Sequence, residues 1–142
     1  MTRQSGVSLI EVLISLLVLG IGILGMVALQ TRSLALDREA YLRSQAASLA
    51  YDLGDRMRAN EGQLGAYATA LGNDVNCDDD EPSGGSLASR DLADWLIDIA
   101  CTLPEGDGSV AVTGDEVVIT VAWSSAPGLG GDQQRFETWV QP

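Results

Sequence analysis

The chain has 142 residues, enough for one domain and one further segment, and its charge is strongly lopsided. It contains eight Arg, no Lys, no His and twenty acidic residues, for a net charge of −12. Without His or Lys it cannot build a Ser-His-Asp triad, a Ser-Lys dyad or a Schiff-base lysine. Two Cys and no His do not make a typical closed zinc site. We therefore expect no enzyme, no catalytic residue, no metal site and no cofactor.

The acidic residues are concentrated after the first sixty positions. From Glu61 onward there are two Arg and fifteen acids, a local net charge of −13. Binding to nucleic acid depends on Lys and Arg that neutralise phosphates, so this part of the chain would repel it. We expect no nucleic-acid partner for this region.

The first thirty residues contain a long apolar run. Twenty residues without charge separate Glu11 from Arg32, enough to span the hydrocarbon core of a bilayer as a helix. A secretory signal peptide would be shorter and would end in a small-x-small cleavage site, which the residues around Ala28 fit poorly. A plain membrane anchor would avoid an acid such as Glu11, which costs about 2.5–3.5 kcal/mol near the bilayer centre and less toward its surface.

The stretch GVSLIEVLISLLVLGIG, which begins at Gly6, resembles the signal sequence of type IV prepilins and type II secretion pseudopilins. The resemblance implies that a short leader ends at Gly6, that prepilin peptidase cuts there, and that the new N-terminal Val7 is N-methylated. Val7 stands where Phe or Met is more usual. It also implies that Glu11 has a role in assembly.

A role for Glu11 also follows from electrostatics. Leader removal creates an α-amine close to Glu11 in the sequence. The amine of a neighbouring subunit, about 4 Å from the Glu11 carboxylate at an effective dielectric constant near 20, would gain about 4 kcal/mol of attraction. The alternative is that Glu11 lies at the membrane surface without a partner.

The apolar pattern becomes amphipathic after Arg32. Apolar residues recur at three- and four-residue spacing and predict a helical face: Leu42, Ala46, Leu49, Leu53 and Met57. Together the two segments predict one helix from about Ser8 to Asn60. The segment DRMRAN, with GIGILG upstream, resembles minor pilins of the PilV type, and pseudopilins remain the alternative.

The remaining residues predict a small α+β domain. We expect a short helix over 63–71, a loop over 72–85, a helix capped by Ser86 or Ser89 and ending near Cys101, and strands near 110–112, 117–123 and 135–140. The second of these helices has an apolar inner stripe that places Trp95 in the core, and its acids face water: Leu92, Trp95, Leu96 and Ile99 inside, and Asp91, Asp94 and Asp98 outside. In the last strand, alternation points Phe136 and Val140 one way and Trp139 the other. The acidic loop residues could hold calcium, but their spacing is not that of an EF-hand, so a solvated loop is preferred: Asp78, Asp79, Asp80 and Glu81. An antiparallel sheet packed on the long helix is the fold of the pilin family that the chain resembles.

The only two cysteines are Cys77 and Cys101. Export would place them in an oxidising compartment, where a disulfide closing this loop would contribute about 3–4 kcal/mol. Free thiols are the alternative.

The predicted organisation has four parts. They are a leader peptide (1–6), a transmembrane and pilus-core helix (7–30), an amphipathic continuation (31–60) and a periplasmic domain (61–142). We expect a single-pass protein of the inner membrane, with its C-terminal domain in the periplasm, that later enters a pilus fibre. The expected partners are prepilin peptidase, other minor and major pilins and the membrane.

Overall fold

The computed structural model describes residues 8–79, 84–125 and 132–141. The chain forms two compact units, Met1–Arg38 and Glu39–Pro142, which we call the N-terminal unit and the globular unit. Helix α1 (Leu9–Ala59) begins in the first and ends in the second. Its bounds agree with the predicted helix to within one residue at each end.

The described part of the N-terminal unit is helical and fully exposed. Every residue from Ser8 to Arg38 is exposed, and no helix hydrogen bond is interrupted by Pro. Of the described residues, one helix, α1, is long and apolar enough to cross a membrane.

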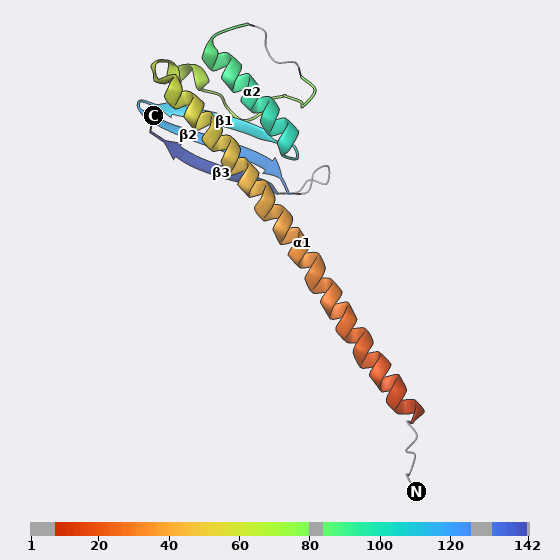
Figure 1. Ribbon diagram of the computed structural model, residues 1–142. Helices are drawn as coiled ribbons and strands as arrows, with labels where there is room; N and C mark the ends of the chain where they lie inside the picture. The colour runs from red at the N-terminus through yellow and green to blue at the C-terminus, as the bar shows by residue number, and fades with distance from the viewer. Residues whose placement is uncertain (1–7, 80–83, 126–131, 142) are drawn as a thin grey trace. The chain divides into compact units, whose positions relative to one another are not determined.

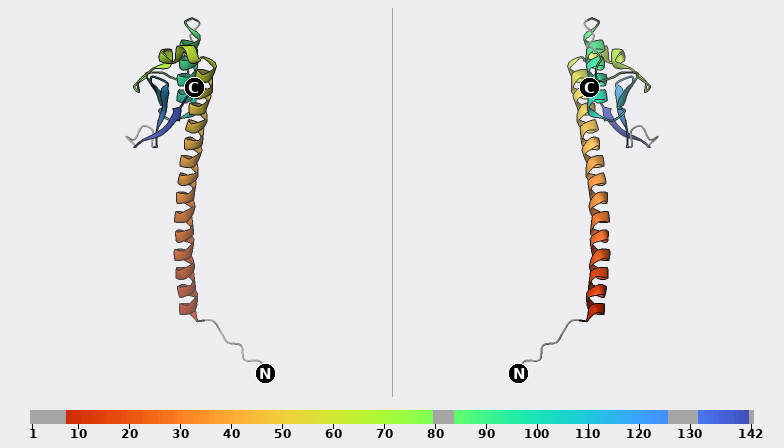
Figure 2. Two further views of the ribbon diagram at one scale, coloured as in Figure 1. Left: turned by 90° about the vertical axis from the view of Figure 1, so that its left-hand side faces the viewer. Right: turned by 90° about the vertical axis from the view of Figure 1, so that its right-hand side faces the viewer.

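The globular unit has two layers. The end of α1, a 3-10 helix η1 (Glu61–Tyr67) and helix α2 (Leu87–Thr102) lie on one face of a sheet. The sheet is antiparallel with the order β1 (Asp107–Thr113), β2 (Glu116–Ser124) and β3 (Gln133–Val140). Figures 1 and 2 show α1 and α2 together over the same face. The predicted α+β fold is therefore confirmed.

The core lies between the helices and the central strand. The predicted stripe of α1 points into it, with Leu42, Ala46, Leu53 and Met57 at most 9% exposed, and Leu49 partly buried against it. Alternation along β2 places Val117, Ile119 and Val121 on the same face, where all three are buried. Burying each such side chain stabilises the fold by about 1.5–3 kcal/mol.

Local sequence signals place the ends of α2. Ser86 caps the helix, and its side chain accepts a hydrogen bond from the backbone N–H of Ser89 at 3.2 Å. On the predicted inner stripe Trp95, Leu96 and Ile99 are buried. The short helix expected over 63–71 is instead the 3-10 helix η1, which is kinked at Gln63.

The described turn between β1 and β2 is built around a glycine. Gly114 has φ +63° in the tight β1–β2 turn, a left-handed conformation that Gly adopts without strain. In β3, Phe136 points toward α1 and Trp139 points to the opposite face, where it is 64% exposed. This is the alternation predicted for the last strand.

Two glycines allow α2 to lie close to β1. A Cβ on Gly108 would come within 2.5 Å of the Trp95 ring and 2.9 Å of Ile99. A Cβ on Gly106 would come within 2.5 Å of the carbonyl oxygen of Ile99. Trp95 can thus be buried deeply because Gly106 and Gly108, at the start of β1, have no side chain.

We expect Gly108→Ala to destabilise the globular unit by about 1–3 kcal/mol, because the Trp95 ring must move out of its packed position. The matched control is Gly65→Ala, since nothing lies within 4 Å of a Cβ at that position. Chemical unfolding followed by tryptophan fluorescence measures both. Equal stability of the two variants would contradict this account of the packing.

Candidate functional site

The predicted processing residues Gly6 and Val7 lie outside the described residues. Glu11 is described and lies in the first turn of α1. Its backbone N–H donates to the Ser8 carbonyl at 3.0 Å, and its own carbonyl accepts a 2.6 Å hydrogen bond from the Ser15 hydroxyl. The backbone around Glu11 is thus held in helix while the side chain is exposed.

The Glu11 carboxylate forms no ion pair within the described part of the chain. An acid in the first turn is favoured by the positive end of the helix dipole. The residues that follow it, up to Thr31, carry no charge.

The apolar surface beside Glu11 is extensive. Thirteen large apolar side chains between Ile10 and Val27 are 47–72% exposed, and Leu9 and Leu29 add to them. Monomeric soluble proteins rarely expose a contiguous apolar surface of this kind. The described part of the N-terminal unit thus presents an apolar surface of a kind that a bilayer or other apolar helices would cover.

The globular unit joins its helices through Tyr67, which the sequence analysis did not single out. The Tyr67 hydroxyl donates to Asp91 Oδ2 at 2.7 Å and accepts from Asn60 Nδ2 at 3.2 Å. These bonds join η1, α2 and the end of α1. Asp91 was expected to face water, but this contact leaves it only partly exposed.

The surroundings of Tyr67 make its hydroxyl less acidic. Burial raises the pKa of Tyr67 above its ordinary value of 10.0, the hydrogen bond from Asn60 opposes this, and the nearby Asp91 carboxylate adds to it. The hydroxyl therefore stays protonated, as a donor to Asp91, at physiological pH.

A second connection joins α1 to α2. The Trp95 indole N–H donates to the Leu49 carbonyl at 2.9 Å, so the buried ring has its polar group satisfied. Arg56 of α1 pairs with Asp52 at 2.8 Å and lies 4.0 Å from Asp98 of α2. Trp95 thus belongs to the core, as the sequence predicted, and not to a binding site.

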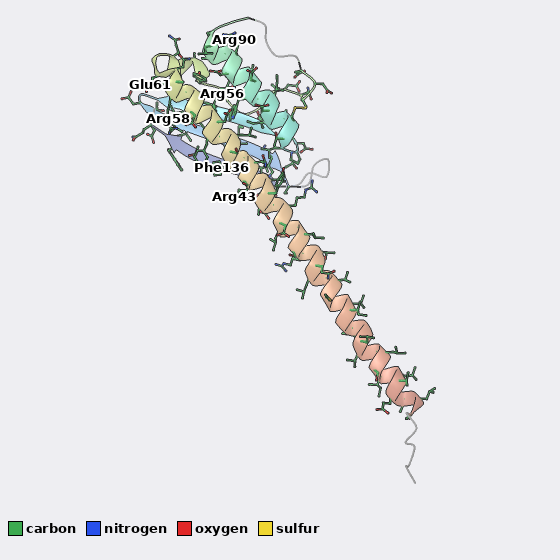
Figure 3. All side chains as sticks on the ribbon, in the orientation of Figure 1. Arg43, Arg56, Arg58, Glu61, Arg90 and Phe136 are labelled. Carbon is green, nitrogen blue, oxygen red and sulfur yellow. A yellow bond between two sulfur atoms is a disulfide. The ribbon has the colours of Figure 1, made fainter. Side chains whose placement is uncertain are left out.

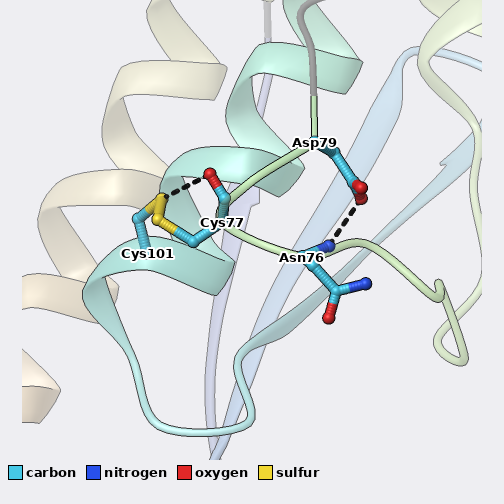
Figure 4. The surroundings of a disulfide bond; sticks show 4 residues. All are labelled: Asn76, Cys77, Asp79 and Cys101. Carbon is cyan, nitrogen blue, oxygen red and sulfur yellow. Dashed lines mark hydrogen bonds between the residues drawn. A yellow bond between two sulfur atoms is a disulfide. The ribbon is translucent and has the colours of Figure 1, made fainter.

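The disulfide expected between Cys77 and Cys101 forms in the structure and ties the acidic loop to the last turn of α2 (Figure 4). Next to it, Asp79 Oδ2 accepts from the backbone N–H of Asn76 at 2.7 Å. Closing a loop of this length stabilises the folded state by about 3–4 kcal/mol. The disulfide therefore holds the loop at one point, while the described acids Asp78 and Asp79 stay exposed.

The calcium alternative concerns Asp78 and Asp79, which are described and exposed, and Asp80 and Glu81, which lie outside the described residues. Among the residues that the structure describes, no three His, Cys, Asp or Glu side chains are grouped as metal ligands. Asp79 instead bonds the backbone of its own loop.

A further polar cluster fixes the chain before this loop. The Asn73 amide nitrogen lies 2.8–2.9 Å from the Ala70 carbonyl, the Gly108 carbonyl and Asp107 Oδ1. Asp107 Oδ2 also accepts from the Gly72 N–H at 2.6 Å. Asn and Asp are typical of turns, but their pairing across 34 residues has no sequence signal.

Comparison with known families supports the resemblance found in the sequence. Residues 1–27 match the prokaryotic N-terminal methylation motif. Residues 28–93, somewhat less than half of the chain, match the family described as type IV pilin Tt1218. No curated protein and no solved structure matches the chain at a significant level.

We expect Tyr67→Phe to cost about 1 kcal/mol at pH 7, because Asp91 and Asn60 lose a partner but both can turn to water. Because the pKa of Tyr67 is higher in the folded chain, its contribution is fully present below pH 10.0 and is lost as pH rises above that value. Tyr67→Phe should therefore flatten the alkaline fall in stability.

The control is Tyr51→Phe, since Tyr51 is 57% exposed and would keep its ring contact with Phe136. Unfolding curves of the full-length chain in detergent between pH 7 and pH 11 decide the matter. An equally steep alkaline fall in the Tyr67→Phe variant would contradict it.

Proposed function

We propose that the chain, which matches the models of a type IV pilin family and of the N-terminal methylation motif, serves as a minor subunit of a type IV pilus. In this role it would help to initiate assembly of the fibre or enter it as a scarce component. The observation that carries the proposal is the exposed Glu11 in the first helical turn, followed by an exposed apolar helix. A type II secretion pseudopilin, with the same helix and sheet, is the second candidate.

The methylation motif implies processing by prepilin peptidase. We propose cleavage after Gly6 and N-methylation of Val7. Gly at the cut lets the backbone enter a narrow protease cleft without a side chain. Cleavage would place a new amine four residues before Glu11 in the sequence.

We propose that the apolar part of α1 occupies two environments in turn. The apolar part of α1 would first cross the inner membrane once, with the globular unit in the periplasm. It would then leave the bilayer and pack among the helices of other pilins. In both places the apolar side chains are covered, so the step between them depends on specific contacts such as that of Glu11 with an amine.

A minor role is favoured by the resemblance of Asp55–Asn60 to PilV-type minor pilins. In this segment Arg58 pairs with Asp55, and Arg56 pairs with Asp52, on the exposed side of α1. Met57, between them, is fully buried in the core. The segment therefore combines a core position with a charged outer surface that other pilins could contact.

Cleavage predicts a defined mature mass. We expect protein isolated from membranes to lack Met1–Gly6 and to carry one methyl group on Val7. Gly6→Val should leave the full-length chain in the membrane, because the branched side chain obstructs the protease. A mature protein that begins beyond Leu29 would instead show a secretory signal peptide and would contradict the proposal.

Glu11 separates a pilin from a plain anchor. We expect Glu11→Ala to insert and to be cleaved normally, because Gly6 and the apolar run are intact. Its amount in sheared pili, or in a complex with other pilins, should fall at least about tenfold, since an attraction of about 4 kcal/mol is lost. Immunoblots of the membrane and pilus fractions measure both quantities.

Glu11→Gln keeps the shape of the side chain and tests whether its charge is required. It should be nearly as defective as Glu11→Ala if the partner is an amine. Normal incorporation of both variants would show that Glu11 has no part in assembly.

A further inference from the structure

The two edges of the sheet differ in their hydrogen bonding. On the outer edge of β1, Val110 exchanges two backbone hydrogen bonds with Thr69, at 2.9 and 3.0 Å. On the outer edge of β3, the described residues supply no such partner. One edge is therefore partly closed by the chain itself, and the other is open.

The register identifies which groups of β3 point outward. Because Val110 bonds away from β2, its opposite residue Ile119 bonds toward β3, where it faces Thr138. The bond from the Ser125 N–H to the Asp132 carbonyl fits the same alternation. Arg135, Glu137 and Trp139 thus direct their N–H and C=O groups to the open edge.

The open edge has few of the features that usually protect such strands. Natural sheets block their edges with Pro, charged side chains (especially Lys), bulges or very short strands, and of these β3 carries one Arg and one Glu. Strand β3 has eight residues, no Pro and no Lys, and it pairs with β2 without a break in register. Such an edge can accept an added strand from another chain.

Aromatic side chains lie on both sides of this edge. On the helix side, Phe136 (labelled in Figure 3) contacts Tyr51 of α1 edge to face, with ring centroids 6.2 Å apart. On the opposite side, Trp139 is 64% exposed. Since successive side chains of an added strand point to alternate faces, such a strand would meet aromatic surface on both. Exposed Trp and Tyr are common as energetic centres of interfaces.

Charge indicates which kind of strand would bind. The globular unit has five Arg and eighteen acids, a net charge of −13, so a second copy of the chain would be repelled. A neutral or basic strand would be attracted. Strand β3 itself carries one positive residue, Arg135, and one negative residue, Glu137, so its own charges do not select the charge of the added strand.

We propose that the β3 edge binds an extended, neutral or basic strand of a different pilin subunit, which continues the sheet beyond β3. The choice of a pilin as the partner rests on the proposed function. Backbone hydrogen bonds to Arg135, Glu137 and Trp139 hold the added strand, and Tyr51, Phe136 and Trp139 contact its side chains.

Hydrogen exchange of single amides tests the proposal directly. The full-length chain in detergent is compared with the same chain in sheared pili or in a purified complex with other pilins. The amides of Arg135, Glu137 and Trp139 should exchange at least about a hundredfold more slowly after assembly, whereas those of Phe136 and Thr138 are already protected in detergent.

A matched pair of variants adds a functional readout. Glu137→Pro removes an outward N–H and leaves the bonds to β2, as Pro is tolerated on an open edge. Glu137→Ala removes the side chain but keeps the N–H. We expect Glu137→Pro to be cleaved normally but to fall at least about tenfold in the assembled fraction, with Glu137→Ala at the wild-type level. A melting curve shows whether Glu137→Pro is folded. If it is not folded, the amide exchange of the wild-type chain alone tests the proposal.

Three results would overturn the proposal. One is fast exchange of the Arg135, Glu137 and Trp139 amides in the assembled protein. Another is equal incorporation of folded Glu137→Pro and Glu137→Ala. The third is protection of these amides already in detergent together with a doubled mass, which would assign the edge to a second copy. A chain that is absent from every assembled fraction would instead contradict the proposed function.

Discussion

The globular unit depends on the burial of one stripe of α1 against β2. Three strands and one further helix offer few apolar residues, and the buried residues of β2 share one core cluster with Leu53 and Met57 of α1. Small side chains make the contact close. Ala46 and Ala50 are fully buried, and a Cβ on Gly54 would lie 3.2 Å from Val140 at the end of β3. The C-terminal part of α1 belongs to this core, so it cannot detach without unfolding the globular unit.

The polar contacts of the globular unit hold the remaining segments in place around this core. Tyr67 connects η1 to α2, Asn73 connects the chain before the acidic loop to β1, and the disulfide connects the loop to the end of α2. These hydrogen bonds and the disulfide add to the stability of the domain, because a small domain buries little apolar surface and gains limited stability from its core alone. The Arg residues of α1 contribute less, since exposed ion pairs are worth about 0–1 kcal/mol.

The two proposed functional surfaces lie where the core leaves the described chain uncovered. One is the N-terminal helical turn with Glu11, whose carboxylate forms no ion pair among the described residues. The other is the outer edge of β3, whose backbone groups point outward by the same alternation that closes the β1 edge on Thr69. Both surfaces would use main-chain or N-terminal groups of another subunit. Such groups are present in every pilin, while charge would select among the partners that present them.

The sequence by itself determined the elements and the processing signal. Periodicity predicted α1, the inner stripe of α2 and the alternation that leaves Trp139 exposed, because burial on one face imposes a local spacing of apolar residues. The motif around Gly6 and Glu11 was readable because the peptidase and the membrane act on contiguous residues. Tertiary structure alone decided the roles of Tyr67 and Asp91, the Asn73–Asp107 bonds, the closeness of Gly108 to Trp95 and the contrast between the two sheet edges. These contacts join residues that are far apart in the chain. Because they depend on three-dimensional position, they leave no periodic signal in the sequence.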